Sequence, residues 1–272
     1  MQEAHPLRCR KICIANSKGG VGKTTTTLEC AAHAGSMGYR VLVVDMDPQS
    51  DSTKILLGNP LENHEKHVFH VLVGSASVED VVRVANDNWV NTHIIPSDLQ
   101  LTTLPEHIFG SLGYEKRLDR VLKSIEHLYD IVIIDTGPQV TILTQLAMRA
   151  ADFLVIPTDT SLYSEHAIEK TLDIAKQLKE DVGHNIELLG IVCTAGHKGS
   201  AKANLLAKEI LEKKYGKQFI KEEIPHCIKI QEAQRSNING YSVPAMNLLN
   251  KDHPLYYNYQ KLTTTCIGKE LQ

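Results

Sequence analysis

Short apolar runs alternate with longer amphipathic stretches along most of the chain. Seven of the apolar runs have the length and the branched side chains typical of strands: KICIAN (11–16), RVLVVD (40–45), THIIPS (92–97), YDIVIID (129–135), DFLVIP (152–157), ELLGIVC (187–193) and QFIKEEIP (218–225). Stretches with helical periodicity lie between most of them. Because the predicted strands are apolar on both faces, the pattern predicts an α/β fold: a doubly wound, mostly parallel sheet with helices on both faces.

Two of the helical stretches, 118–128 and 167–180, each carry one apolar face. The predicted faces consist of Leu118, Val121, Leu122, Ile125 and Leu128 in the first stretch, and Ile168, Leu172, Ala175 and Leu178 in the second. The region 46–91 is the least regular, and we expect only short helices there. No linker divides the chain, so the sequence predicts one domain over 1–272, with 1–9 as a flexible arm and no helix-turn-helix domain ahead of it.

Composition narrows the class of protein further. The 272 residues are 42% hydrophobic and 22% charged, which is ordinary for a globular protein. The formal net charge of −3 excludes a polycation that binds nucleic acid through bulk charge. No signal peptide or membrane span is recognisable, and none of the six cysteines has C-x-x-C spacing. These features favour a cytoplasmic protein with reduced thiols.

A glycine-rich loop, SKGGVGKTTTT, joins the first predicted strand to a helix. In that context backbone N–H groups and the helix N-terminus bind a phosphate anion. Lys23 is expected to reach the β- and γ-phosphates, Thr24 to offer its hydroxyl to Mg²⁺, and Thr25 to bond the α-phosphate. A tight turn without a ligand would not require the GKT ending. The residues expected at the nucleotide are Lys18, Gly19, Gly20, Val21, Gly22, Lys23, Thr24 and Thr25.

The loop departs from the standard phosphate loop at its first two positions. Ser17 stands where a glycine usually opens the motif, and Lys18 follows it. KGGVGKT is the deviant Walker A sequence, and from this point the chain resembles the ParA/MinD family of ATPases. The resemblance implies a homodimer with ATP sandwiched between the subunits, in which Lys18 reaches the phosphates of the partner's nucleotide. A lysine supplied in this way would neutralise dense phosphate charge, whereas the simpler interpretation is a solvated loop lysine.

Three aspartates follow buried strands, where open α/β sheets bind ligands. Asp45 and Asp47 lie in D-x-D-P-Q, and Asp135 ends a Walker B pattern. Asp135 is expected to hold Mg²⁺ through water, and the resemblance places Asp45 near Mg²⁺ and Asp47 at the attacking water. Alternatively, Asp45 caps the following turn. The family's usual D-x-P-P reads D-T-G-P here, with Gly137 at the third position.

Residues 196–235 carry nine Lys and Arg against five Glu, a net charge of +4, whereas the rest of the chain carries −7. This asymmetry is typical of a nucleic-acid face, although solvated helices with paired Lys and Glu produce it too. IPHCIKIQEAQRSNINGYSV (224–243) resembles a ParA/Soj segment. The resemblance places Pro225 at the nucleotide and Lys229 at a position used for non-specific DNA binding. The expected contacts to double-stranded DNA are Lys198, Lys202, Lys229 and Arg235.

The resemblance therefore implies a ParA/Soj-like partition ATPase, weak on its own, with ATP and Mg²⁺ as cofactors. Such a protein would be cytoplasmic and associated with the nucleoid. A ParB-like or other cargo-linked activator would stimulate hydrolysis. The cargo, whether a plasmid, a chromosome or a protein complex, is not encoded in any motif of the sequence.

Other functions share the nucleotide motifs. A MinD-like membrane-associated regulator would end in a basic amphipathic helix, and YNYQKLTTTCIGKELQ lacks both the cationic face and the apolar register, so no membrane partner is expected. An iron–sulfur carrier would need a cysteine pair, and a non-hydrolysing scaffold would show no turnover. Two features have no assigned role. One is Asp159, where relatives commonly have glutamine. The other is His64, His67 and His70, whose spacing fits one helix face, either as solvated or packing histidines or as metal ligands.

Overall fold

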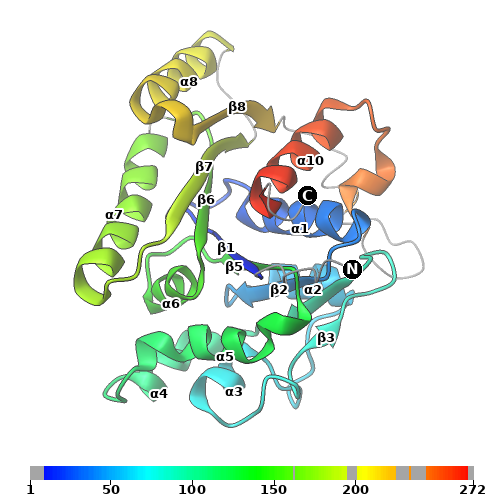
Figure 1. Ribbon diagram of the computed structural model, residues 1–272, viewed down its shortest axis with the longest axis vertical. Coiled ribbons are helices and arrows are strands. Elements are labelled where there is room, and N and C mark those ends of the chain that lie inside the picture. Colours follow the sequence, from blue (N-terminus) through cyan, green and yellow to red (C-terminus); the bar gives the residue numbers. More distant parts are fainter. Residues whose placement is uncertain (1–8, 162, 195–200, 225–232, 234–242, 269–272) are drawn as a thin grey trace, which may run out of the picture.

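The structure is a computed structural model that describes residues 9–161, 163–194, 201–224, 233 and 243–268. Its centre is one eight-stranded sheet with the order β3-β4-β2-β5-β1-β6-β7-β8 (Figure 1). The strands are β1 (Arg10–Ile14), β2 (Val41–Met46), β3 (Arg83–Val84), β4 (Thr92–Ile95), β5 (Ile131–Thr136), β6 (Phe153–Thr158), β7 (Glu187–Thr194) and β8 (Phe219–Ile224). All neighbouring strands are parallel except β3 and β4. The predicted mostly parallel, doubly wound sheet is confirmed.

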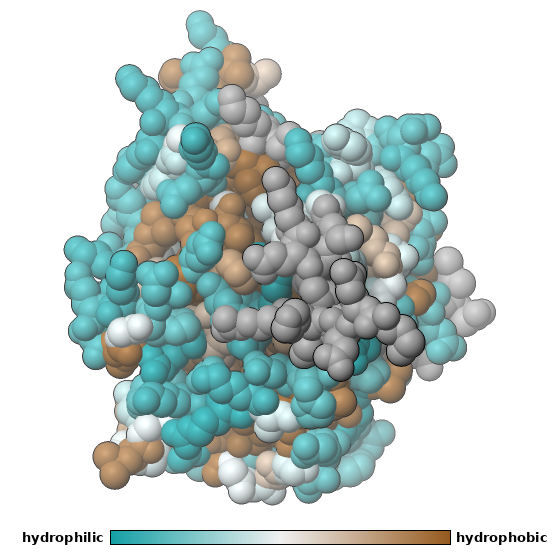
Figure 2. All heavy atoms as spheres, viewed as in Figure 1, coloured by the Kyte–Doolittle hydropathy of each residue, from teal (hydrophilic) through white to brown (hydrophobic). Residues whose placement is uncertain are grey.

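Helices cover both faces of this sheet (Figure 1). The α-helices are α1 (Lys23–Ser36), α2 (Asp51–Leu57), α3 (Val68–Val73), α4 (Leu104–Ile108), α5 (Arg117–Ile125), α6 (Ile142–Ala150), α7 (Ser164–Val182), α8 (Ala201–Tyr215) and α10 (Pro254–Ile267). The 3₁₀ turns are η1 (Leu99–Thr103), η2 (Tyr114–Lys116), η3 (Glu126–Leu128), η4 (Gly216–Gln218) and η5 (Ala245–Leu248). Figure 2 shows apolar side chains gathered over the α7 and α8 side of a largely hydrophilic face.

The core is divided by the sheet into two apolar clusters. Alternation along β1 sends Ile12 and Ile14 to the side of α1 and α10, and Cys13 to the side of α5, α6 and α7. β1 is hydrogen-bonded to β5 on one side and β6 on the other. A central strand covered on both faces requires an unbroken apolar run, which explains why KICIAN lacks polar alternation.

The local predictions were mostly correct, with several exceptions. The faces of α5 and α7 pack on the core as expected, but Leu128 lies beyond α5 in η3 and is 48% exposed, because the helix ends at Ile125. The short antiparallel β3 was not predicted. Cys9, assigned to the flexible arm, is 5% exposed within the core.

The three histidines do not share a helix face, so that expectation was wrong. α3 begins after His67, which caps it, and His64 lies in the turn before. The backbone N–H of His67 donates to Nδ1 of His70. Among the described residues, no group of three His, Cys, Asp or Glu side chains has a metal-binding arrangement. Nor is any described helix both long and apolar enough to span a bilayer.

Candidate nucleotide site

The glycine-rich loop connects β1 to α1 at the carboxyl edge of the sheet. Gly20 and Gly22 adopt left-handed backbone conformations, with φ of +74° and +79°. Side chains rarely tolerate this region, so these two glycines are required by the shape of the loop. α1 begins at Lys23 and has no side-chain cap at its N-terminus. The N-terminus of α1 and its dipole thus face the loop, where an anion would be stabilised.

Lys23 points back across this loop. Its side chain is largely buried, and Nζ donates to the carbonyl oxygen of Lys18 at 2.9 Å. Burial lowers the pKa of Lys23, while the charges of Asp135 and Asp47 raise it. A cation held inside the loop by a single carbonyl acceptor would be better satisfied by phosphate oxygens.

The Asp135 carboxylate lies at the end of β5 and is fully buried. It accepts hydrogen bonds from Ser52 Oγ at 2.6 Å and from the hydroxyl of Thr24, with Thr27 Oγ1 at 3.4 Å. Burial raises the pKa of Asp135, and the hydroxyls of Ser52 and Thr24 lower it. The structure therefore brings together Thr24 and Asp135, two of the three groups that the sequence assigned to Mg²⁺; the third is Asp45. Ser52 was missed, because a serine in a short helix carries no motif.

Asp45 lies beside Asp135, paired with it in register across β2 and β5. Its carboxylate accepts from the backbone N–H groups of Asp47 and Thr53 and from Thr53 Oγ1. This is the turn-capping arrangement that the sequence left as the alternative for Asp45. Burial raises the pKa of Asp45, and the charge of Asp135 adds to the increase.

Asp47 is more accessible than Asp45 and lies against the loop that follows β5. Its Oδ1 accepts from the backbone N–H of Gln49 at 3.0 Å. A Cβ on Gly137 would lie 3.1 Å from the same oxygen. The D-T-G-P departure thus leaves room for the Asp47 carboxylate beside the backbone.

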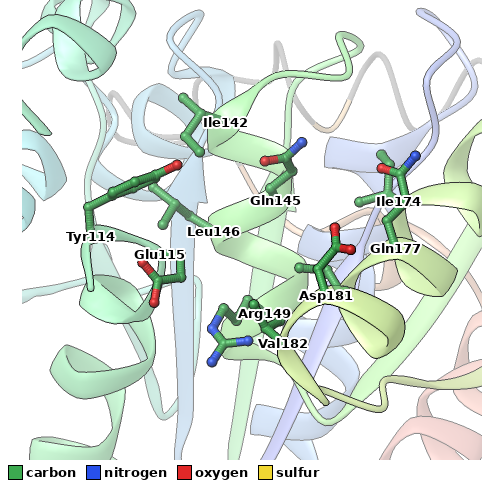
Figure 3. A pocket seen from close by; sticks show the side chains of 11 residues that line it. Tyr114, Glu115, Ile142, Gln145, Leu146, Arg149, Ile174, Gln177, Asp181 and Val182 are labelled. Carbon is green, nitrogen blue, oxygen red and sulfur yellow. The ribbon is translucent and has the colours of Figure 1, made fainter. Parts of the chain in front are cut away.

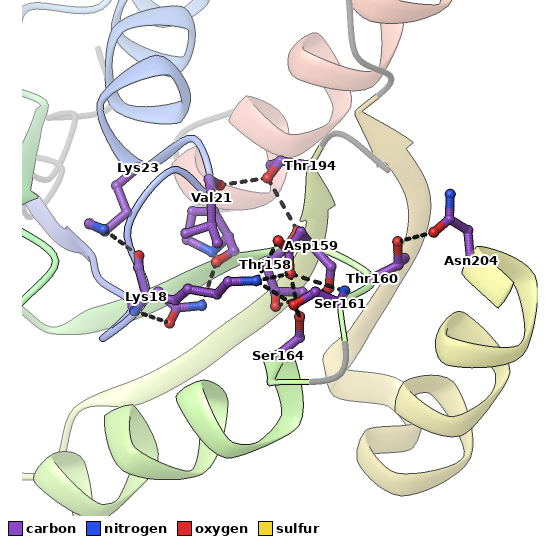
Figure 4. Close-up of polar contacts among 12 residues, drawn as sticks. Lys18, Val21, Lys23, Thr158, Asp159, Thr160, Ser161, Ser164, Thr194 and Asn204 are labelled. Carbon is purple, nitrogen blue, oxygen red and sulfur yellow. Dashed lines mark hydrogen bonds and ion pairs between the residues drawn. The ribbon is translucent and has the colours of Figure 1, made fainter. Parts of the chain in front are cut away.

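Lys18 points out of the loop, in the direction opposite to Lys23 (Figure 4). Its Nζ lies 2.5 Å and 2.7 Å from the two carboxylate oxygens of Asp159, which follows β6, and also contacts Ser161 Oγ. The side chains of Lys18 and Asp159 are 25% and 17% exposed. Lys18 is therefore not a freely solvated loop lysine. Asp159, to which the sequence assigned no role, is its partner.

Thr194, at the end of β7, supports the loop from behind. Its buried Oγ1 donates to the carbonyl oxygen of Val21 at 2.5 Å and lies 3.2 Å from that of Thr158 (Figure 4). It also lies 3.4 Å from the position that a Cβ on Gly22 would occupy. A threonine near the end of a strand gives no sequence signal, so this support was not predicted.

The basic residues expected at DNA are mostly outside the described part of the chain. Lys202 is described and is exposed on α8. Lys198, Lys229 and Arg235 lie outside the described residues, as does Pro225, which follows the last residue of β8.

A separate cavity of about 320 Å³ lies between η2, α6 and α7 (Figure 3). Glu115 and Asp181 flank Arg149 there, and the buried Nε and Nη1 of Arg149 have no hydrogen-bond partner among the described residues. Arg149 belongs to the last turn of α6, where a cation is stabilised by the helix dipole.

Comparison with known proteins places the chain in a family. Residues 9–188 match the sequence profile of a family described as an AAA domain. The chain is 33% identical to the sporulation initiation inhibitor protein Soj of Bacillus subtilis over 224 residues, 82% of this chain and 86% of Soj. It is 30% identical to the cell division protein PomZ of Myxococcus xanthus, over 82% of this chain and 69% of PomZ.

The chain belongs to the ParA/Soj family of partition ATPases. This ParA/Soj-family protein is therefore a P-loop ATPase. Among solved structures, apo McdA of Cyanothece has a TM-score of 0.82 at 23% identity and covers 96% of this chain and all of McdA. Cobyrinic acid a,c-diamide synthase from Mycobacterium smegmatis has a TM-score of 0.77 at 22% identity, over 94% and 93% of the two chains. At such identities the likeness shows the fold alone.

Proposed function

We propose that this protein is a switch that dimerises around ATP, binds DNA without sequence preference and positions a cargo. ATP and Mg²⁺ are its cofactors. The observation that carries the proposal is the opposite orientation of two lysines on one phosphate loop (Figure 4). Lys23 serves the nucleotide of its own subunit. Lys18 points away from that nucleotide, towards Asp159 and the groove beside α7 and α8, and in this proposal it serves a nucleotide presented by a second subunit.

The groups around the loop have the donor types that a Mg²⁺–nucleotide complex requires. Mg²⁺ prefers oxygen ligands and keeps several waters, which suits the Thr24 hydroxyl and the Asp135 carboxylate. In this proposal the ion offsets phosphate charge, Lys23 neutralises the β- and γ-phosphates, and Thr25 bonds the α-phosphate. Asp45 supports the turn that carries Asp47. Asp47 orients the attacking water, a role for which an accessible carboxylate is sufficient.

The surface beside Lys18 supports an interface between two copies of the chain. A groove of about 650 Å³ runs between the start of α7 and α8, and Lys18 is among its lining residues. Its neighbourhood exposes several large apolar side chains: Tyr163 at 75%, Leu205 at 59%, Leu206 at 58% and Ile210 at 49%. Such a patch is costly in water, and closing a second subunit over it would remove that cost while bringing Lys18 to the partner.

DNA binding is supported by charge and by the family. The net charge of +4 over 196–235 contrasts with the acidic remainder of the chain, and the described member of the predicted set, Lys202, is exposed. We propose that Lys198, Lys202, Lys229 and Arg235 contact phosphates. Such contacts weaken steeply with salt. The protein would then reside on the nucleoid, and a ParB-like or other cargo-linked activator would release it by stimulating hydrolysis.

The test is co-sedimentation of the Asp47→Ala variant with unrelated DNA fragments, with ATP or ADP, over a salt series. The proposal expects ATP-dependent, sequence-independent retention that falls as salt rises. The double variant Lys229→Ala, Arg235→Ala should no longer co-sediment with DNA but should still dimerise with ATP. Co-sedimentation with anionic liposomes but not with DNA would instead identify a MinD-like regulator and overturn the DNA proposal.

A further inference from the structure

All hydrogen-bonding capacity of the Lys18 ammonium is used within its own subunit. Nζ contacts both carboxylate oxygens of Asp159 and the hydroxyl of Ser161 (Figure 4). An ammonium has three N–H donors, and three acceptors surround it here. Lys18 can therefore bond a phosphate only after it has given up these contacts.

Asp159 is itself held in place by the start of α7. Ser164 Oγ and the backbone N–H of Ser161 both donate to its Oδ1. Burial would raise the pKa of Asp159, but hydrogen bonds from Lys18 and Ser164 outweigh burial and lower it. Asp159 is thus a fixed anion at neutral pH.

The backbone of Lys18 is anchored independently of its side chain. Its N–H donates to Asn16 Oδ1 at 2.9 Å, and the neighbouring Ser17 Oγ donates to the carbonyl oxygen of Ala167 in α7 at 3.1 Å. Ser17, which replaces the usual first glycine of the motif, is therefore a tie between the loop and α7. Because the backbone is fixed, only the Lys18 side chain has to turn for the ammonium to leave Asp159.

We propose that Asp159 is a positioning residue that retains Lys18 in its own subunit until the nucleotide of a second subunit replaces it. The inference rests on the proposed function, since it takes Lys18 as the lysine that acts across the dimer. A triphosphate offers more negative charge than one carboxylate, and a diphosphate offers less than a triphosphate. Competition with Asp159 therefore raises the nucleotide concentration needed for dimerisation. It also favours ATP over ADP as the nucleotide that supports the dimer.

The size of the effect follows from the exposure of the pair. Hydrogen bonds to charged groups contribute most when they are buried, and partial exposure reduces the contribution. For a pair that is about a quarter exposed, we expect removal of the Asp159 charge to lower the ATP concentration needed for dimerisation about tenfold.

The first experiment needs no nucleotide and so does not depend on the proposed function. The nucleotide-free protein and Asp159→Asn are pulse-labelled with an amine-reactive reagent, and modification of Lys18 is measured by mass spectrometry relative to exposed Lys202. Lys18 should react several-fold more slowly than Lys202 in the unchanged chain and at a similar rate in Asp159→Asn. Equal Lys18 reactivity in the two proteins would overturn the proposal.

The second experiment measures dimerisation by light scattering across an ATP titration in Asp47→Ala protein. Adding Asp159→Asn should lower the ATP concentration at the dimer midpoint about tenfold, and Ser164→Ala should lower it less. With Lys18→Ala also present, Asp159→Asn should not restore the dimer in ATP, because Asp159 acts through Lys18. A purely structural role would instead change the melting temperature by the same amount with and without Lys18.

The proposed function of Lys18 and the proposed role of Asp159 would be contradicted by different results. If Lys18→Ala dimerises normally with ATP, the function of Lys18 across the dimer is wrong, and the labelling result still decides whether Asp159 retains it. If Lys18→Ala blocks dimers but Asp159→Asn leaves the midpoint unchanged, only the role of Asp159 is overturned.

Discussion

Gly137 leaves the space that the Asp47 carboxylate occupies, since a Cβ on Gly137 would lie 3.1 Å from Asp47 Oδ1 and 3.3 Å from Cγ. Gly137→Ala should therefore displace the carboxylate by a few tenths of an ångström. We expect ATP turnover to fall about three- to tenfold, with ATP affinity unchanged, because the position of the Asp47 carboxylate is disturbed while the phosphate loop is intact. Single-turnover hydrolysis and equilibrium ATP binding measure the two quantities. A loss of ATP affinity equal to the loss of turnover would contradict this account.

Thr194 should support the loop through its hydroxyl alone. Thr194→Val keeps the volume but removes the bonds to the carbonyls of Val21 and Thr158. We expect a loss of about 1–2 kcal/mol in the free energy of unfolding and a several-fold weaker affinity for ADP. Thr263→Val is the matched control, since its buried hydroxyl donates to the carbonyl oxygen of Tyr259 within α10 rather than to the phosphate loop. If both variants weaken ADP binding equally, Thr194 has no specific role at the loop.

Lys23 should be essential for nucleotide binding. Lys23→Ala removes the only cation that points into the loop among the described residues at the site, so the affinity for ATP and ADP should fall by at least a hundredfold. Titration with a fluorescent ATP analogue measures the effect. Lys54→Ala, which changes an exposed lysine of α2, should bind as the unchanged protein does. Retained binding by Lys23→Ala would refute the placement of the phosphates.

Glu29 should make stability depend on pH. It is buried on α1, and its carboxylate accepts from the backbone N–H of Ala245 at 2.8 Å. Burial raises its pKa from 4.5 to about 7, although the N–H groups of Ala245 and Met246 lower it. The folded protein therefore holds this proton more tightly than the unfolded chain does. The contribution to stability is complete below about pH 4.5 and is lost as the pH rises towards about 7.

The loss should be on the order of 3 kcal/mol. Urea unfolding at several pH values between 5 and 8 measures it, and Glu29→Gln should make the profile less steep over that range, in which Asp45 and Asp135 also titrate. Glu209→Gln, on the exposed surface of α8, should leave the profile unchanged. A profile that is the same with and without Glu29 would show that this carboxyl does not titrate there.

The sequence was sufficient for the parts of the fold that follow from burial. Strands covered on both faces need unbroken apolar runs, which is why β1, β2, β5 and β6 were predicted close to their observed bounds. The short β3 was not predicted, because two paired residues at a sheet edge have no pattern of their own. Leu128 was misplaced for a similar reason: periodicity continued past Ile125 although the helix did not.

The functional site also contains some residues that the sequence identified and others that it did not. Lys18, Lys23 and the three aspartates were recognisable because their roles depend on a fixed spacing beside glycines and strand ends. Their partners come from distant parts of the chain: Ser52 meets Asp135, and Asp159 and Thr194 meet the loop, only after folding. Contacts of this kind depend on the arrangement of strands in the sheet, and no short motif encodes them.

The central claim is that the unit of function is an ATP-bound dimer to which each subunit contributes its Lys18. Light scattering of Asp47→Ala with ATP and with ADP, with and without Lys18→Ala, tests it most directly. The account predicts the mass of two chains for Asp47→Ala in ATP, and of one chain in ADP or when Lys18→Ala is also present. A dimer that forms equally well without Lys18, or equally well in ADP, would contradict it.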